Sequence, residues 1–143
     1  MVVYEYEADL SNLNNHFPKL FDLYIFADKV GDGKLQNTIT DQVHRISEQF
    51  AMLPSVPTFQ SHMGRLPEDC MLMRWLVDHY AFTSSNKVYN AESVALCPAF
   101  FARVLSVMAD QHNLPGGLQY SLPKDRKTKC YYHLHDGDTR ACQ

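Results

Sequence analysis

Near the C-terminus, four side chains have the identities of zinc ligands: Cys130, His133, His135 and Cys142. Thiolate sulfur and imidazole nitrogen are the usual ligands of a closed, tetrahedral structural zinc site. Residues two apart in an extended segment point to the same face, so His133 and His135 can reach one ion. Gly137 permits a sharp turn that would bring Cys142 back toward them. The sequence therefore predicts a structural zinc site, although the spacing is not that of the common zinc finger. The alternative is an unordered C-terminus that happens to hold these residues.

A basic run precedes this cluster and lies beside Tyr131 and Tyr132. It consists of Lys124, Arg126, Lys127 and Lys129. Cations next to aromatic rings are typical of phosphate contacts. The run also contains an acid, Asp125, and the stretch around it lacks helical periodicity. We interpret it as a solvated surface segment, with nucleic-acid binding as the less favoured alternative.

Sequence motifs of common enzymes are missing. The chain contains no Gly-x-Ser-x-Gly, no glycine-rich phosphate loop and no His-Glu-x-x-His. Asp28 and Lys29 are expected to form a helix-end ion pair or cap rather than a catalytic pair. Cys70 and Cys97 stand singly beside apolar helix faces, where small core residues are expected. A Ser–His–Asp or Cys–His site needs a spatial closeness that a sequence does not show. We therefore expect a protein that is not an enzyme.

The bulk composition favours a folded protein inside the cell. The chain has 143 residues, enough for one domain or for a fragment of a larger one. Its hydrophobic fraction of 45% can build a core, and its charged fraction of 20% is too low for a disordered tail. A net charge of −3 argues against capture of the whole chain by nucleic acid or membrane. No apolar run of about 18 residues occurs, and the N-terminus carries acids where a signal peptide is basic. We expect an intracellular protein, outside the membrane, with reduced cysteines.

Apolar residues recur at helical intervals along most of the chain. Pro18 is tolerated only in a first turn, so the first helix is predicted to begin at residue 15 or 16 and to end near Val30. Further helices are predicted over 34–52, 68–82 and 98–112, with a helical turn over 91–96 and a weak strand over 2–6. The predicted fold class is mostly α, a small helical bundle with a short N-terminal strand and an irregular C-terminal Cys/His tail.

Three stretches, taken in order, resemble fungal BTB/POZ proteins. The first is Leu23 to Lys29 followed by Leu35, in which the matching positions are Tyr24, Ala27, Asp28, Lys29 and Leu35. The second contains Arg74-Trp75-Leu76-Val77-Asp78, which is similar to the helix after the BTB domain. The third is the Cys130, His133 and His135 ending. Eight residues of the first two stretches are predicted to bind a partner or to form the core: Tyr24, Ala27, Asp28, Lys29, Leu35, Arg74, Trp75 and Leu76.

The resemblance implies the C-terminal part of such a protein. Residues 1–52 would be the end of the BTB domain, 53–67 a linker, 68–112 the following helical region and 113–143 the tail. Most of the BTB sheet, the dimer-forming helix and the cullin-facing surface would be absent, which leaves dimerisation open. Asp32 stands where the family has an aliphatic residue, and we expect a looser turn there.

The predicted function is a non-enzymatic protein–protein interaction module with an unidentified protein partner. Four amphipathic helices, the missing catalytic motifs and the three ordered stretches favour it. The alternative is a small zinc-dependent nucleic-acid-binding protein that uses the Cys/His tail and the basic run.

Overall fold

The computed structural model describes residues 13–82, 91–112 and 131–134. Within them the helices are α2 (Leu13–Val30), α3 (Gly33–Phe50), α4 (Val56–Gln60), α5 (Met71–Ala81), α6 (Ala91–Leu96) and α7 (Pro98–His112). The described part of the chain is a small, mostly α-helical bundle, as predicted. The strand predicted over 2–6 lies outside the described residues, as do 113–130 and 135–143 of the predicted tail.

The turn between α2 and α3 is closed by a helix cap at each side. Gly31 has a φ of 71°, the left-handed conformation that glycine adopts without steric cost. Its N–H donates to the carbonyl of Asp28, and the N–H of Asp32 donates to the carbonyl of Ala27 at 2.8 Å. These two bonds form a Schellman motif, which satisfies the last carbonyls of α2. Asp32 then caps α3, because its carboxylate accepts the N–H of Leu35 at 3.0 Å. The expectation of a looser turn at Asp32 is therefore wrong.

Three helix boundaries differ from the predictions. α2 begins at Leu13 and places Pro18 beyond its first turn, so the proline did not mark the helix start. α3 ends at Phe50, where Ala51 takes a left-handed conformation. α5 begins only at Met71, after a turn in which the sulfur of Cys70 accepts the N–H of Met73. The helices over 91–96 and 98–112 have the predicted bounds.

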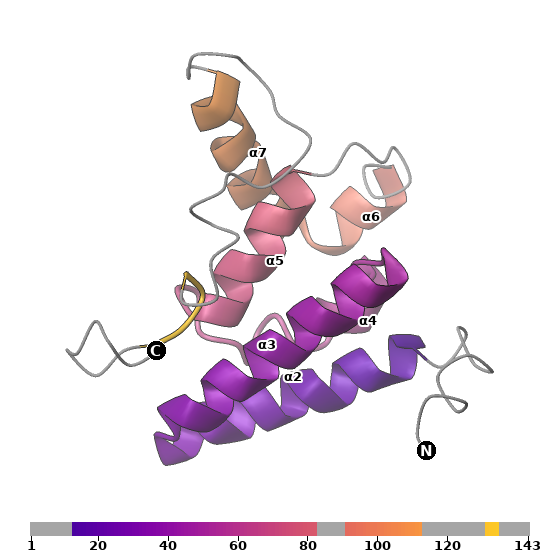
Figure 1. Cartoon of the computed structure of the whole chain (residues 1–143). Coiled ribbons are helices and arrows are strands. Elements are labelled where there is room, and N and C mark those ends of the chain that lie inside the picture. The colour runs from indigo at the N-terminus through magenta and orange to yellow at the C-terminus, as the bar shows by residue number, and fades with distance from the viewer. Residues whose placement is uncertain (1–12, 83–90, 113–130, 135–143) are drawn as a thin grey trace.

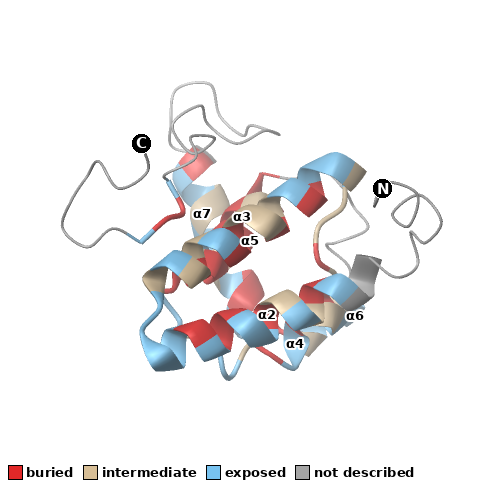
Figure 2. Cartoon of the chain, turned by 60° about the horizontal axis from the view of Figure 1, so that its bottom comes forward, coloured by how far each residue is buried: buried red, intermediate tan, exposed pale blue. Residues whose placement is uncertain are grey.

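The helices pack as two connected groups (Figure 1). α2 and α3 lie side by side as a helical hairpin, while α5 packs along α7. α4, with Pro57 in its first turn, lies within the predicted linker and contacts both α2 and α6. Figure 2 shows the buried residues on the inward faces of the helices and exposed residues on their outer faces.

One hydrophobic cluster joins the two groups. Its largest fully buried side chains are Trp75, Tyr24, Tyr80, Phe17, Phe21, Phe59, Leu72 and Leu76. Phe59, Tyr80 and Phe100 meet edge to face, with ring centroids 5.0–5.8 Å apart. This arrangement is favoured by the ring quadrupoles. The hydroxyl of Tyr80 is satisfied by the carbonyl of Pro54 at 2.5 Å. None of the helices in the described ranges is long and apolar enough to cross a membrane.

Candidate functional site

Four of the positions predicted to bind a partner or form the core belong to the core. Tyr24 and Ala27 of α2 are fully buried, as are Trp75 and Leu76 of α5. Burial of its ring raises the pKa of the Tyr24 hydroxyl above its usual range, and the neighbouring Cys70 adds to the effect. These side chains belong to the one hydrophobic core cluster and offer no surface to a partner.

The other four positions lie at the edge of the core or on the surface. Asp28 and Lys29 are exposed in the last turn of α2, and Asp28 accepts a hydrogen bond from the side chain of Gln36 at 3.4 Å. Leu35 is half-buried and packs on the core. Arg74 is exposed and lines a cavity between α5 and α7. The structure therefore does not gather these eight residues into one site.

A second apolar face of α2 was missed by the sequence reasoning. Leu23, Phe26 and Val30 are 47%, 56% and 58% exposed. Their spacing of three and four residues puts them in one row, on the opposite side of α2 from Phe17, Phe21 and Tyr24. We call this row the α2 stripe. The signal was present in the sequence, because α2 contains more apolar residues than a single core-facing face needs.

Residues 131–134 lie against α3 and α5, and hydrogen bonds hold them there. The Tyr132 hydroxyl donates to Asp78 of α5 at 2.8 Å. His133 Nε2 lies 2.6 Å from Asp41 of α3 and donates to it, because an ionised carboxylate only accepts. The side chain of Asn37 accepts the N–H of Leu134 at 2.7 Å and donates to its carbonyl at 2.9 Å. We call Tyr131–Leu134 the docked segment; it is drawn in yellow in Figure 1.

Beside the docked segment, two histidines and a tryptophan form an aromatic cluster. Trp75 donates its indole N–H to His44 Nδ1 at 3.1 Å and stacks on His79 with ring centroids 3.9 Å apart. His79 Nδ1 lies 2.8 Å from the carbonyl of Trp75, so this nitrogen carries the proton. Burial lowers the pKa of His79 to about 4, with a smaller contribution in the same direction from His44, although the bond to the Trp75 carbonyl acts the other way. His79 therefore stays neutral at pH 7 and acts as a packing residue.

The predicted zinc site is described at one ligand only. His133 is buried in the docked segment, whereas Cys130, His135 and Cys142 lie outside the described residues. Within residues 13–82, 91–112 and 131–134, no three metal-ligating side chains come together. Because Nε2 of His133 is bonded to Asp41, a metal would have to bind through Nδ1. A carboxylate that orients a histidine in this way is typical of metal sites.

Asp22, Ser61 and His62 come together as a Ser–His–Asp chain, which the sequence did not show. His62 Nε2 donates to Asp22 at 3.0 Å, so its Nδ1 is left to accept from the Ser61 hydroxyl at 3.2 Å. Asp22 also pairs with Arg65 at 3.2 Å. The His62 ring is only 4% exposed and packs edge-on against Phe21. A general acid must reach the leaving group, and this buried ring cannot. The arrangement ties the loop after α4 to α2.

The two described cysteines are core residues rather than nucleophiles. Cys70 and Cys97 are buried free thiols. Burial raises the pKa of both thiols above the usual value. A thiol with a raised pKa holds little of the reactive thiolate at neutral pH, which agrees with the structural role expected for both.

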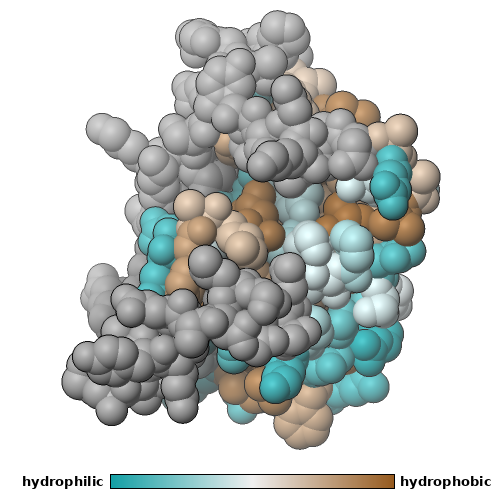
Figure 3. Space-filling view, turned by 90° about the vertical axis from the view of Figure 1, so that its right-hand side faces the viewer, coloured by the Kyte–Doolittle hydropathy of each residue, from teal (hydrophilic) through white to brown (hydrophobic). Residues whose placement is uncertain are grey.

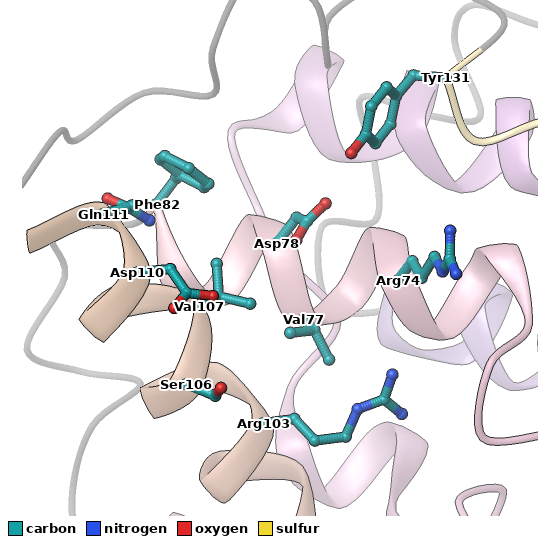
Figure 4. Close-up of a pocket in the computed structure, with 10 residues that line it drawn as sticks. All are labelled: Arg74, Val77, Asp78, Phe82, Arg103, Ser106, Val107, Asp110, Gln111 and Tyr131. Atoms are coloured by element: carbon teal, nitrogen blue, oxygen red, sulfur yellow. The ribbon is translucent and has the colours of Figure 1, made fainter. Parts of the chain in front are cut away.

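The described residues line several cavities, of which two lie beside α7. One of about 370 Å³ lies between α5 and α7. Figure 4 shows Arg74 and Arg103 at one end of it, Phe82, Asp110 and Gln111 at the other, and Tyr131 entering from the docked segment. The second, of about 630 Å³, has an apolar floor that includes Met63, Met73 and Phe100.

The polarity of the surface varies from one part of the molecule to another. On the face shown in Figure 3, apolar side chains gather at the upper right and appear again at the lower edge, with mainly hydrophilic side chains between them on the right.

Comparison with protein-family models, with curated proteins and with solved structures finds no match for this chain.

Proposed function

We propose that the chain is a non-enzymatic protein–protein interaction module that offers the α2 stripe to a helix of a partner protein. The observation that carries the proposal is the exposure of Leu23, Phe26 and Val30 in one row. Single exposed apolar residues are ordinary on protein surfaces, but a contiguous apolar row marks a contact surface. Their three-and-four spacing is that of a helix–helix seam, so the partner surface that fits it is an apolar helix.

The resemblance to fungal BTB/POZ proteins supports the same role, because proteins of that family act by contacting other proteins. Tyr24, Ala27, Trp75 and Leu76, which carry part of the resemblance, supply core that holds α2 in place. In this proposal they position the stripe, and the stripe makes the contact.

A photo-crosslinking experiment tests the proposal. A benzoylphenylalanine is placed at Phe26 or, as a matched control, at Leu105, which is 62% exposed on α7. We expect the probe at position 26 to cross-link to one defined protein, at an apolar helix of that protein, with a yield that saturates as the partner concentration rises. The probe at position 105 should give no such product. A product of twice the chain mass would identify a second copy as the partner. The same products from both positions would refute the proposal.

Substitution of the stripe provides a second test. A triple variant with Gln at positions 23, 26 and 30 should abolish that product. The stability of the chain should change by no more than about 0.5 kcal/mol per substitution, because these side chains are already largely exposed. A large loss of stability would mean that the row packs within the chain, which contradicts a docking role.

We also propose that a structural zinc ion is held by His133 with Cys130, His135 and Cys142. The support is the bond from His133 to Asp41, which would orient the ring for binding through Nδ1. Metal analysis of the reduced full chain should find about one zinc per chain, lost in Cys130→Ser and kept in the control Cys97→Ser. Equal zinc content in both variants would exclude the site. Salt-sensitive oligonucleotide binding by the zinc-loaded chain would instead support the nucleic-acid alternative.

A further inference from the structure

The docked segment is held by side chains of other elements and not by regular secondary structure. Residues 131–134 form turn and irregular backbone, yet Tyr132 and His133 are buried. Two of these four residues are therefore buried although the segment belongs to no helix or sheet. The helices therefore provide a surface that is complementary to this short, non-helical piece of chain.

Asn37 recognises the backbone of the segment. Its side-chain carbonyl accepts the N–H of Leu134, and its side-chain amide donates to the carbonyl of the same residue. A β-strand offers the same pair of bonds to a neighbouring strand. Asn37 can therefore bind any extended chain that passes this point, whatever side chain that residue carries. Main-chain bonds of this kind give affinity in many peptide-binding proteins.

Two carboxylates add side-chain selectivity. Asp41 lies one helical turn after Asn37 on the same face of α3, and it accepts from His133. Asp78 is buried on α5 and accepts the Tyr132 hydroxyl. A buried carboxylate is costly unless hydrogen-bond donors reach it. A ligand with phenylalanine in place of Tyr132 would not supply this donor, so the surface favours tyrosine followed by histidine.

We propose that α3 and α5 form a peptide-binding site for a non-helical Tyr-His-aliphatic segment, with Tyr132–Leu134 as its built-in ligand. A partner protein that presents the same three side chains in a non-helical segment competes with Tyr132–Leu134 for Asn37, Asp41 and Asp78. The site uses no residue of the α2 stripe, so this proposal and the docking role of the stripe stand or fall separately. It shares His133 with the proposed zinc site, and the test below is therefore made without metal.

The site continues into the cavity between α5 and α7. Tyr131 and Asp78 both line that cavity, and Asp78 also binds Tyr132 (Figure 4). A ligand that continues on the N-terminal side of the tyrosine therefore meets this cavity. This continuity gives the site room for a peptide longer than the three residues it recognises.

A competition experiment in the full chain tests the proposal. The variant Tyr132→Ser/His133→Ser weakens the built-in ligand and leaves α3 and α5 unchanged. The probe is the blocked peptide acetyl-Tyr-Tyr-His-Leu-amide, titrated in the presence of EDTA and followed by NMR chemical shifts of Asn37 and its neighbours. The tethered segment acts at an effective concentration of about a millimolar, so we expect the peptide to bind the variant at least about tenfold more tightly than the unchanged chain.

Matched controls separate recognition from non-specific binding. The peptide acetyl-Tyr-Phe-Ala-Leu-amide lacks both side-chain donors and should bind the variant at least about tenfold more weakly. Adding Asn37→Ala to the variant should weaken binding of the first peptide similarly. Equal binding to the variant and the unchanged chain, or binding to neither, would overturn the proposal.

Hydrogen exchange in the unchanged chain gives an answer even where the double variant does not fold. The N–H of Leu134 should be protected from exchange, and Asn37→Ala should remove that protection without affecting the centre of α5. Free exchange of the Leu134 N–H in the unchanged chain would show that no ligand occupies the site, and the proposal would fail.

Discussion

The neutral state of His79 links the stability of the fold to pH. The unfolded chain binds a proton at this residue below pH about 6.5, whereas the folded chain does so only near pH 4. Between these values the unfolded state binds more protons, so stability is complete above pH about 6.5 and is lost as the pH falls toward 4. One pKa unit corresponds to about 1.4 kcal/mol, so this loss amounts to about 3 kcal/mol. It is a large part of the stability of a typical domain.

The substitution that isolates this effect is His79→Phe. Phenylalanine keeps a ring stacked on Trp75 and lies at the same position of α5, but it does not titrate. Urea unfolding followed by Trp75 fluorescence should be measured from pH 7.5 to pH 4 for both chains. We expect the free energy of unfolding of the unchanged chain to fall by about 3 kcal/mol more than that of the variant over this range.

A direct titration completes the test. NMR titration of the His79 ring should give a pKa well below 6.5. Parallel stability curves for the unchanged chain and His79→Phe, or a pKa of about 6.5 for His79, would refute the burial argument.

Other substitutions test the core, the turn and the docked segment. Trp75→Ala should destabilise the chain by about 3–5 kcal/mol, and Tyr24→Ala by a similar amount, because each leaves a cavity among fully buried side chains. Urea unfolding at pH 7 measures both losses. No loss of stability at either position would contradict the packing. Gly31→Ala should lower the stability by about 1 kcal/mol because the φ of Gly31 is 71°. Gly33→Ala should leave the stability unchanged or raise it, because the new methyl group would lie in open space. Thermal melts in which Gly33→Ala is the less stable variant would contradict the Schellman turn. Tyr132→Phe should cost about 1–3 kcal/mol, because Asp78 loses a donor in a buried site; an unchanged unfolding midpoint would show that this bond contributes little.

Much of the fold could be predicted because helix formation is governed by nearby residues. The bounds of the helix over 98–112 followed from Pro98 and the apolar spacing, and they are correct. The start of α5 was predicted three residues early, because the turn before Met71 depends on the Cys70 sulfur and on packing. The second apolar face of α2 was visible in the sequence, but only burial shows which face meets the core.

The candidate sites were much less predictable. The sequence singled out His133 and supplied its possible zinc-ligand companions, but not Asp41, which is 92 residues away. In the same way, Tyr132 and Asp78 are 54 residues apart, and Asp22 and His62 are 40 apart. In each case the partners are ordinary polar residues with no shared motif.

Helical periodicity, the apolar stripes and the identity of most core residues were therefore determined by the sequence alone. They depend on backbone geometry that repeats every few residues, and any chain with this pattern buries the same faces. Which polar groups meet was decided only by the tertiary structure. A hydrogen bond needs its two atoms within a few tenths of an ångström of the right distance. That precision arises only once α3, α5 and residues 131–134 have packed together.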